Sequence, residues 1–139
     1  MNKVAFYYRK DLNVTKHGEY KAGSDMKMGD PVRRDDATGT LVLAQNSDEF
    51  EGIVDAVRWN VQGGDTLDIK KDEICRVGVG VDYEFVVKGG SSDFSSINEN
   101  TEVGVNAGKF VIVDGTTVTK AVGKVIKKFD SGEVVVRIY

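Results

Sequence analysis

Two runs of short apolar segments separated by turn residues constrain the fold of this chain more than any other feature. The first run occupies residues 28–59, and a fainter second run occupies residues 100–129. In both runs an apolar segment follows a turn that contains glycine, as expected for strands joined by tight turns. Segment 39–43 matches segment 108–112, and 52–54 matches 123–125 at nearly the same spacing along the chain. The sequence therefore predicts two related units, each built from short strands.

β-Branched residues dominate the apolar composition, with 22 valines and 7 isoleucines against 4 leucines. Such side chains lose rotamer freedom in helices and pack well on a pleated sheet. Together with 16 glycines for tight turns, they predict an all-β fold, either a small β-barrel or a β-sandwich, with two pseudo-repeated strand units. The length of 139 residues favours one domain. We expect an N-terminal strand or extended arm at 1–14 and a single β domain at 15–139, with a flexible loop near 88–98.

Two local patterns make more detailed predictions. The adjacent pair Ile53-Val54 breaks the alternation expected of a half-buried strand, which predicts a bulge near Gly52. The dipeptide Asp114-Gly115 is a strong hairpin signal and predicts a turn that leads into a further strand at 117–119.

The C-terminal region is ambiguous at one point. The apolar residues of 122–129 match a helical stripe, but Gly123 and the match to the first repeat favour a strand. Residues 133–139 form a valine-rich segment that runs to the last residue, so we expect the C-terminus to be built into a sheet, with strands at both termini exposed as edges. Further strands are predicted at 66–70, 74–81, 81–87, 103–105 and 110–113, the last two on either side of a turn at 106–108.

The N-terminus carries an aromatic and basic stretch. Phe6, Tyr7 and Tyr8 are consecutive aromatic residues, and Arg9 follows them. Two interpretations are open: residues 3–8 form an ordinary first strand of the domain's own sheet, or they pair with the sheet edge of a neighbour. On the second interpretation these four residues contact a partner or a sister subunit.

The segment 88–98 (KGGSSDFSSIN) is the clearest loop in the chain because Gly, Ser and Asp in series do not build a packed element. Phe94 lies in its middle and is unexpected there. It either folds back onto the core or inserts into a partner, so we include it among the candidate interface residues.

The sequence offers no strong catalytic or metal-binding motif. His17 is the only histidine and lies in a polar loop without ligand partners at metal-site spacing. Cys75, the only cysteine, lies in an apolar run and is expected to be a small buried hydrophobe. Asp30, Asp35 and Asp36 offer oxygen ligands for a hard cation, but they lack the spacing of an EF-hand and fit turns better. We therefore expect no enzymatic activity and no cofactor or metal.

Charge is unevenly distributed along the chain, although the net charge is only −3. Residues 1–34 carry a net +4, residues 35–119 carry −10, and residues 120–139 carry +3. This pattern is open to two interpretations, docking between complementary surfaces or ordinary solvated surface charge. An acidic chain without basic stretches interleaved with aromatics is not typical of nucleic-acid binding.

Membrane insertion and secretion are not expected either. No apolar run approaches the roughly 20 residues of a membrane helix, and the first apolar run is shorter than the roughly 7–15 residues of a signal-peptide core. A single cysteine allows no disulfide within the chain, which is consistent with folding in a reducing cytoplasm.

Three segments together resemble the small capsid decoration, or cement, proteins of tailed bacteriophages. They are 28–32 (MGDPV), 39–43 (GTLVL) and 50–54 (FEGIV), and the resemblance extends over residues 22–139. It implies a β-barrel or sandwich-like head that binds the outside of an expanded capsid, often as trimers, and reinforces contacts between capsomers. The implied partners are the major capsid protein and sister subunits, with residues 1–12 as the arm that reaches them. The protein would be made in the host cytoplasm and reside on the virion surface.

Two other functions remain open. One is a different virion component, such as a tail-tube or head–tail joining protein, which would polymerise into tubes or rings. The other is a saccharide-binding β module, in which Trp59, Tyr83 or Phe94 would form an exposed stacking platform.

Overall fold

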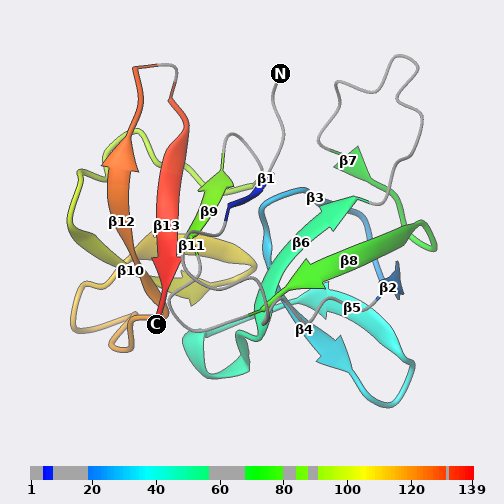
Figure 1. Ribbon diagram of the computed structural model, residues 1–139. Helices are drawn as coiled ribbons and strands as arrows, with labels where there is room; N and C mark the ends of the chain where they lie inside the picture. Colours follow the sequence, from blue (N-terminus) through cyan, green and yellow to red (C-terminus); the bar gives the residue numbers. More distant parts are fainter. Residues whose placement is uncertain (1–4, 8–18, 57–67, 80–83, 88–90, 131) are drawn as a thin grey trace.

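The computed structural model describes residues 5–7, 19–56, 68–79, 84–87, 91–130 and 132–139. Within them the fold is nearly all-β, and its helical element is one short 3₁₀ turn (Figure 1). In chain order the elements are β1 (Ala5–Tyr7), β2 (Glu19–Ala22), β3 (Met26–Lys27), β4 (Pro31–Asp35), β5 (Thr40–Leu43), η1 (Ser47–Glu49), β6 (Gly52–Ala56), β7 (Asp68–Ile69), β8 (Ile74–Gly78), β9 (Glu84–Val87), β10 (Thr101–Asn106), β11 (Lys109–Ile112), β12 (Gly123–Lys128) and β13 (Val134–Ile138). The all-β prediction is confirmed.

The strands form two main bodies that lie side by side in Figure 1. One is a closed five-stranded barrel in the order β2-β5-β4-β6-β8, in which β2 and β5 pair in parallel. The other is a six-stranded antiparallel sheet in the order β1-β9-β13-β12-β10-β11. Strands β3 and β7 form a small separate ribbon beside the barrel. We call the first body the barrel half and the second the sheet half.

The predicted repeat is realised as two strand triplets with the same pairing. The barrel half contains β5-β4-β6, and the sheet half contains β11-β10-β12. Val32 pairs with Gly52 in the first triplet, and their counterparts Val103 and Gly123 pair in the second. The two repeats therefore share one strand register.

The number of residues that separates matching positions of the two repeats is slightly smaller at the second strands, β5 and β11, than at the first and third strands. This difference has a structural cause. Arg34 pairs with Leu41 across the first hairpin, and Val105 pairs with Phe110 across the second. The first hairpin loop consists of residues 36–39, whereas the second contains only Ala107 and Gly108. Strand β11 therefore begins fewer residues after β10 than β5 does after β4. At the third strands, β6 and β12, the separation between matching residues returns to its value at the first strands.

The equivalence extends to the turn before each triplet. Gly29 donates its N–H to Val54 O at 2.9 Å, and Asn100 donates its N–H to Val125 O at 2.6 Å. Both residues adopt positive φ, 100° for Gly29 and 67° for Asn100. Asparagine is among the few residues other than glycine that tolerate this conformation, so the second turn keeps its geometry without the glycine.

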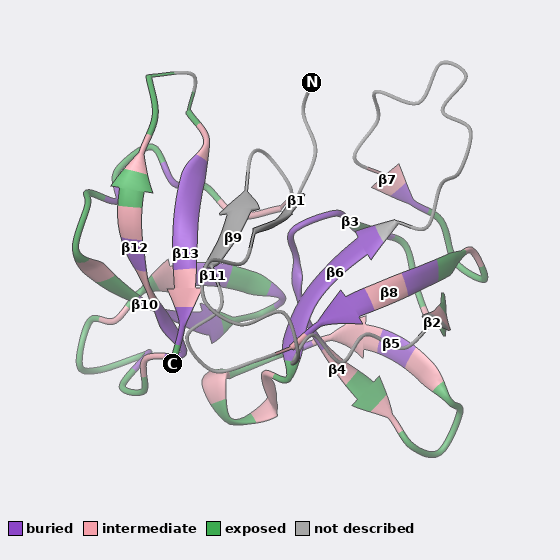
Figure 2. Ribbon diagram, in the orientation of Figure 1, coloured by how far each residue is buried: buried purple, intermediate pink, exposed green. Residues whose placement is uncertain are grey.

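One hydrophobic core extends through both halves (Figure 2). Phe110 is 1% exposed, and its ring lies 5.8 Å from that of Phe50, edge to face, and 6.3 Å from that of Phe94. Phe50 belongs to the segment before β6, so this aromatic group joins the barrel half to the sheet half. The contacts between the halves are therefore part of the main core.

The bulge predicted near Gly52 is wrong. Strand β6 pairs with β8 in continuous register from Ile53 to Ala56. Ile53 and Val54 are both completely buried, because both faces of β6 are covered. A strand covered on both faces does not alternate, and this produced the misleading pattern. The register shift lies instead in β12, between Val125 and Lys127, which explains the helix-like spacing of that strand.

Two predictions for the C-terminal third also need correction. The turn at Asp114 is present, but residues 117–119 do not form a strand; the Asp114 carboxylate instead accepts the N–H groups of Thr116 and Val118, both at 2.9 Å. Strand β13 is part of a sheet, as expected, yet it lies between β9 and β12 rather than at an edge. The C-terminal strand therefore has no free edge for a partner.

Candidate functional site

The N-terminal candidate segment lies at one edge of the sheet half. Phe6 pairs with Phe85 and Tyr7 with Glu84 in the antiparallel β1–β9 ladder. Residues 5–7 thus pair with the domain's own sheet in this structure. Because β1 is the first strand in the sheet order, its other side is not paired within the described sheet. Tyr8 and Arg9 lie outside the described residues.

Phe94 is a core residue in this structure and not a projecting anchor. Its side chain is 6% exposed and packs near Phe110. Ile97, three residues later, is 2% exposed. Residues 91–98 contain no helix or strand, as expected of a loop, and these two apolar side chains attach the segment to the core. Of the two interpretations of Phe94, the structure supports the one in which it folds back.

A lysine holds the same loop from the other side. The Lys128 ammonium group donates to the carbonyl oxygens of Phe94, Ser95 and Ile97 at 3.2, 3.0 and 3.2 Å. An ammonium group has three donors, so these contacts use its full hydrogen-bonding capacity. Lys128 is half-buried on β12, and it therefore fixes the loop to the sheet half.

A buried carboxylate connects the two halves. Asp30, immediately before β4, is completely buried. Its oxygens accept the Ser91 N–H at 2.9 Å, the Ser91 hydroxyl at 3.0 Å and the Lys27 N–H at 2.9 Å. Burial raises the pKa of Asp30, although these hydrogen bonds and the charge of Lys27 oppose the shift. This site is a structural clamp between the halves, because each of these partners is a donor of the same chain.

A second junction joins η1 to the sheet half. The Ser47 hydroxyl accepts the N–H of Val105 at 3.0 Å and donates to Lys120 O at 2.7 Å. Gly104 lies beneath this contact, since a Cβ added there would clash with the Val118 side chain and lie 2.6 Å from Lys120 O. Close approach of the backbone at this position requires glycine.

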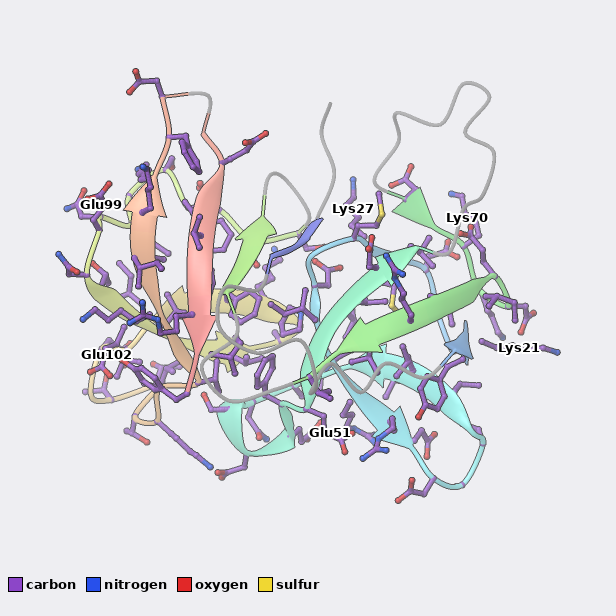
Figure 3. The ribbon with its side chains drawn as sticks, viewed as in Figure 1. Lys21, Lys27, Glu51, Lys70, Glu99 and Glu102 are labelled. Carbon is purple, nitrogen blue, oxygen red and sulfur yellow. The ribbon has the colours of Figure 1, made fainter. Side chains whose placement is uncertain are left out.

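Ion pairs connect the basic ends of the sequence to its acidic middle. Lys27 pairs with Asp68, Arg33 with Glu49, Arg34 with Glu51, and Lys120 with Asp48, at 3.0–3.4 Å. Each of these pairs joins a residue of a net-basic segment to one of the net-acidic segment 35–119. In Figure 3 Lys21 lies on the barrel half, Lys27 and Lys70 lie at the β3–β7 ribbon, and Glu99 and Glu102 lie on the sheet half. Much of the charge pattern is therefore neutralised within the chain, which favours the interpretation as surface charge.

The single cysteine behaves as a structural residue. Cys75 is completely buried in the barrel, and its thiol donates to Tyr20 O at 3.4 Å. Burial, with a smaller contribution from Glu73, raises the pKa of the Cys75 thiol to about 11. The thiol therefore stays protonated near neutral pH. Nucleophilic attack requires the thiolate, so Cys75 is not poised for it. The interpretation as a small buried hydrophobe is confirmed.

The cation site considered for Asp30, Asp35 and Asp36 is not formed. Asp30 is bound inside the molecule, whereas the Asp35 carboxylate accepts the Ala37 N–H and the Thr38 hydroxyl within the first hairpin. In the described ranges, no group of three His, Cys, Asp or Glu side chains is placed to hold a metal ion.

Exposed apolar side chains are the surface features that the sequence did not identify. Ile112 on β11, Phe129 after β12, and the C-terminal Tyr139 are 40%, 38% and 47% exposed. Lys127 places its ammonium group 5.2 Å from the centre of the Phe129 ring. In sequence these residues resemble core positions, because only the assembled sheet shows which strand ends are left uncovered.

Tyr139 is also hydrogen-bonded. Its hydroxyl donates to Glu102 on β10 at 2.7 Å. Partial burial and this contact with the carboxylate raise the pKa of Tyr139 to about 12, so the phenol remains a donor at neutral pH. The bond fastens the end of the chain across the sheet half.

The remaining candidates lie outside the described residues. They are His17, Trp59 and Tyr83. Burial of Phe94 removes one of the three aromatic residues considered for a saccharide platform.

Comparison with known proteins gives no family assignment. No family model matches the chain, and no curated protein matches it. Within the part of the chain that the structure describes, there is no helix with the length and apolar character needed to span a bilayer.

Proposed function

We propose that this protein is a structural component of a tailed-bacteriophage virion that binds the outer surface of the capsid and reinforces contacts between capsomers. One observation carries the proposal. The three segments on which the resemblance to decoration proteins rests form one structural unit, the β5-β4-β6 triplet with its entry turn, and the chain builds that unit twice in the same register.

The internal contacts support a mechanical role. The halves share one core, and buried polar contacts at Asp30 and Ser47 connect them. A cement protein needs a stiff body that transmits force between the surfaces it binds. Many copies that each bind weakly on one shell give a high total avidity, so no deep pocket is needed.

Co-sedimentation with capsids tests this proposal. The purified protein would be mixed with expanded and with unexpanded capsids of candidate phages, and the pelleted fraction would be measured. We expect pelleting with expanded capsids only, and capsids that resist disruption better once coated. Failure to pellet with any expanded capsid, by protein that is folded, would contradict the proposal.

A deletion tests the role of the N-terminal segment. Removal of residues 2–9, which include Phe6, Tyr7, Tyr8 and Arg9, is expected to abolish capsid binding while the domain still folds and unfolds cooperatively, at a lower temperature because the edge strand β1 is lost. A deletion variant that binds capsids like the full chain would refute a docking role for this segment.

The tail-tube or joining-protein alternative makes a different prediction. Such a protein would form long tubes or rings of many copies without any capsid. Electron microscopy combined with the co-sedimentation assay distinguishes the two functions: long tubes or rings from protein that does not pellet with expanded capsids would favour the tail or joining component. A saccharide-binding module, in contrast, would bind glycans as an isolated domain and ignore capsids.

A further inference from the structure

The two repeats contact each other through unlike surfaces. The end of β5 in the first repeat lies against the β10–β11 turn of the second. A Cβ added at Gly108 would lie 3.0 Å from Leu43 Cδ1 and 3.2 Å from Leu43 Cβ. Next to this contact, Ala44 O accepts the Gly108 N–H and Gln45 O accepts the Ala107 N–H, both at 2.9 Å. Each repeat thus has a strand-end surface and a turn surface, and this contact uses one of each.

The counterparts of these surfaces are left exposed. Because β5 and β11 are equivalent strands, Ile112 corresponds to Leu43, and Gly39 corresponds to Gly108. Ile112 is 40% exposed, and it is among the few large apolar side chains with that exposure in the described residues. Gly39 is exposed with φ +71°, similar to +78° at Gly108, but a Cβ added at Gly39 would meet no atom within 4 Å.

The flanking residues follow the same pattern. Ala44, which follows Leu43, is completely buried in the contact between repeats. Its counterpart Val113, which follows Ile112, is only half-buried. The end of β11 and the β4–β5 turn therefore remain uncovered. The contact between the end of β5 and the β10–β11 turn shows how surfaces of these two types fit together.

We propose that a second copy of this chain fills both positions. The β11 end of one copy, with Ile112 at its centre, packs on the β4–β5 turn of the next copy at Gly39, as Leu43 packs on Gly108 within each copy. Such a contact is head-to-tail, so it continues from copy to copy and closes into a ring where the rotation allows. The inference goes beyond the proposed function and does not depend on it, because it concerns the protein without capsids.

This contact is expected to be weaker than the internal one. The β4–β5 turn is longer than the β10–β11 turn, and its Thr38 and Gly39 N–H groups are both bonded to Asp35 O, at 3.3 and 2.7 Å. Their counterparts at Ala107 and Gly108 instead bond to the other repeat. The contact between copies therefore consists mainly of apolar packing around Ile112 and has fewer backbone hydrogen bonds.

Disulfide trapping tests the proposed geometry. At the internal contact, a Cβ added at Gly108 lies 3.2 Å from Leu43 Cβ. This separation is close to the roughly 3.5–4.5 Å between the Cβ atoms of a disulfide. The variants Gly39→Cys and Ile112→Cys, one of them carrying a size tag, would be mixed and oxidised with glutathione disulfide. We expect a mixed disulfide dimer on non-reducing gels, and larger covalent oligomers from the double variant G39C/I112C.

Two controls make the result decisive. Gly132 is also exposed, has φ +93° and has open space around an added Cβ, so Gly132→Cys mixed with Ile112→Cys measures chance collisions. The pair L43C/G108C within one chain shows that the oxidation conditions trap the internal contact. We expect several-fold more mixed dimer from G39C with I112C than from G132C with I112C; equal yields would overturn the proposal.

Sedimentation velocity of protein without introduced cysteines provides the second measurement. The average mass of the wild-type protein should rise with concentration, and Ile112→Asp should reduce that rise. Because Ile112 is 40% exposed at a strand end, this substitution should leave the fold intact, as checked by circular dichroism. A wild-type protein that remains monomeric at every concentration would also overturn the proposal. Neither experiment uses capsids, so a negative result here leaves the capsid proposal untouched.

Discussion

Replacement of Asp30 by alanine should show how strongly the clamp between the halves contributes to stability. In Asp30→Ala the backbone N–H groups of Lys27 and Ser91 lose their acceptor, at a cost of about 1–3 kcal/mol for each buried donor. Removing a buried carboxylate also removes its desolvation penalty, which offsets part of the loss. We therefore expect a net decrease of about 2–4 kcal/mol in the free energy of unfolding. With a slope of about 2 kcal/mol per molar urea, the midpoint should fall by about 1–2 M.

The matched control is an exposed carboxylate in the same part of the molecule. Asp93 also accepts a backbone N–H, that of Ser95 at 2.9 Å, but it is exposed to solvent. Asp93→Ala should therefore shift the urea midpoint much less than Asp30→Ala. If the two variants unfold at the same urea concentration, the reasoning about the buried clamp is refuted.

The pH dependence of the free energy of unfolding provides an independent test of the buried Asp30 clamp. The pKa of Asp30 is raised in the folded state above its ordinary value of 3.8, so the folded protein holds this proton more tightly than the unfolded chain does. The stabilisation that comes from the raised pKa of Asp30 is therefore fully present below the unfolded-state pKa and is lost as pH rises through the folded-state pKa. The stability difference between wild type and Asp30→Ala should shrink as pH increases from about 4. A difference that grows over this range would contradict the burial of the carboxylate.

Three further predictions test other contacts. Gly104→Ala would place a methyl group 2.6 Å from the Lys120 carbonyl, and it should destabilise the protein by about 1–3 kcal/mol in urea unfolding. Lys128→Met keeps most of the aliphatic stem but removes three donors to the loop, so the Ile97 amide should exchange with deuterium faster in NMR while core amides stay protected. Burial raises the pKa of the Cys75 thiol to about 11, so it should not react with a thiol reagent at pH 8 until urea unfolds the barrel.

The sequence predicted the strand content and the repeat because these depend on local pattern. Most of the strands fell near their expected positions, and the ambiguous segment at 122–129 is a strand, β12, in the structure. The predictions that failed depend on what covers a strand. Ile53 and Val54 suggested a bulge because nothing in the sequence shows that both faces of β6 are buried. The position of Phe94 was open because its loop is polar, while its anchors, Phe110 and Lys128, lie elsewhere in the sequence.

The same reasoning explains why the candidate surface was missed. A repeat in sequence identifies equivalent residues, but the two copies of a repeat are in equivalent surroundings only if they contact each other symmetrically. Here they do not, since the strand end at Leu43 meets the turn at Gly108 and not its own counterpart. An unsymmetrical contact between two equivalent units always leaves one surface of each kind unused. Ile112 and Gly39 are those unused surfaces, so their exposure follows from how the repeats pack, and a further copy of the chain presents the complementary surface to each.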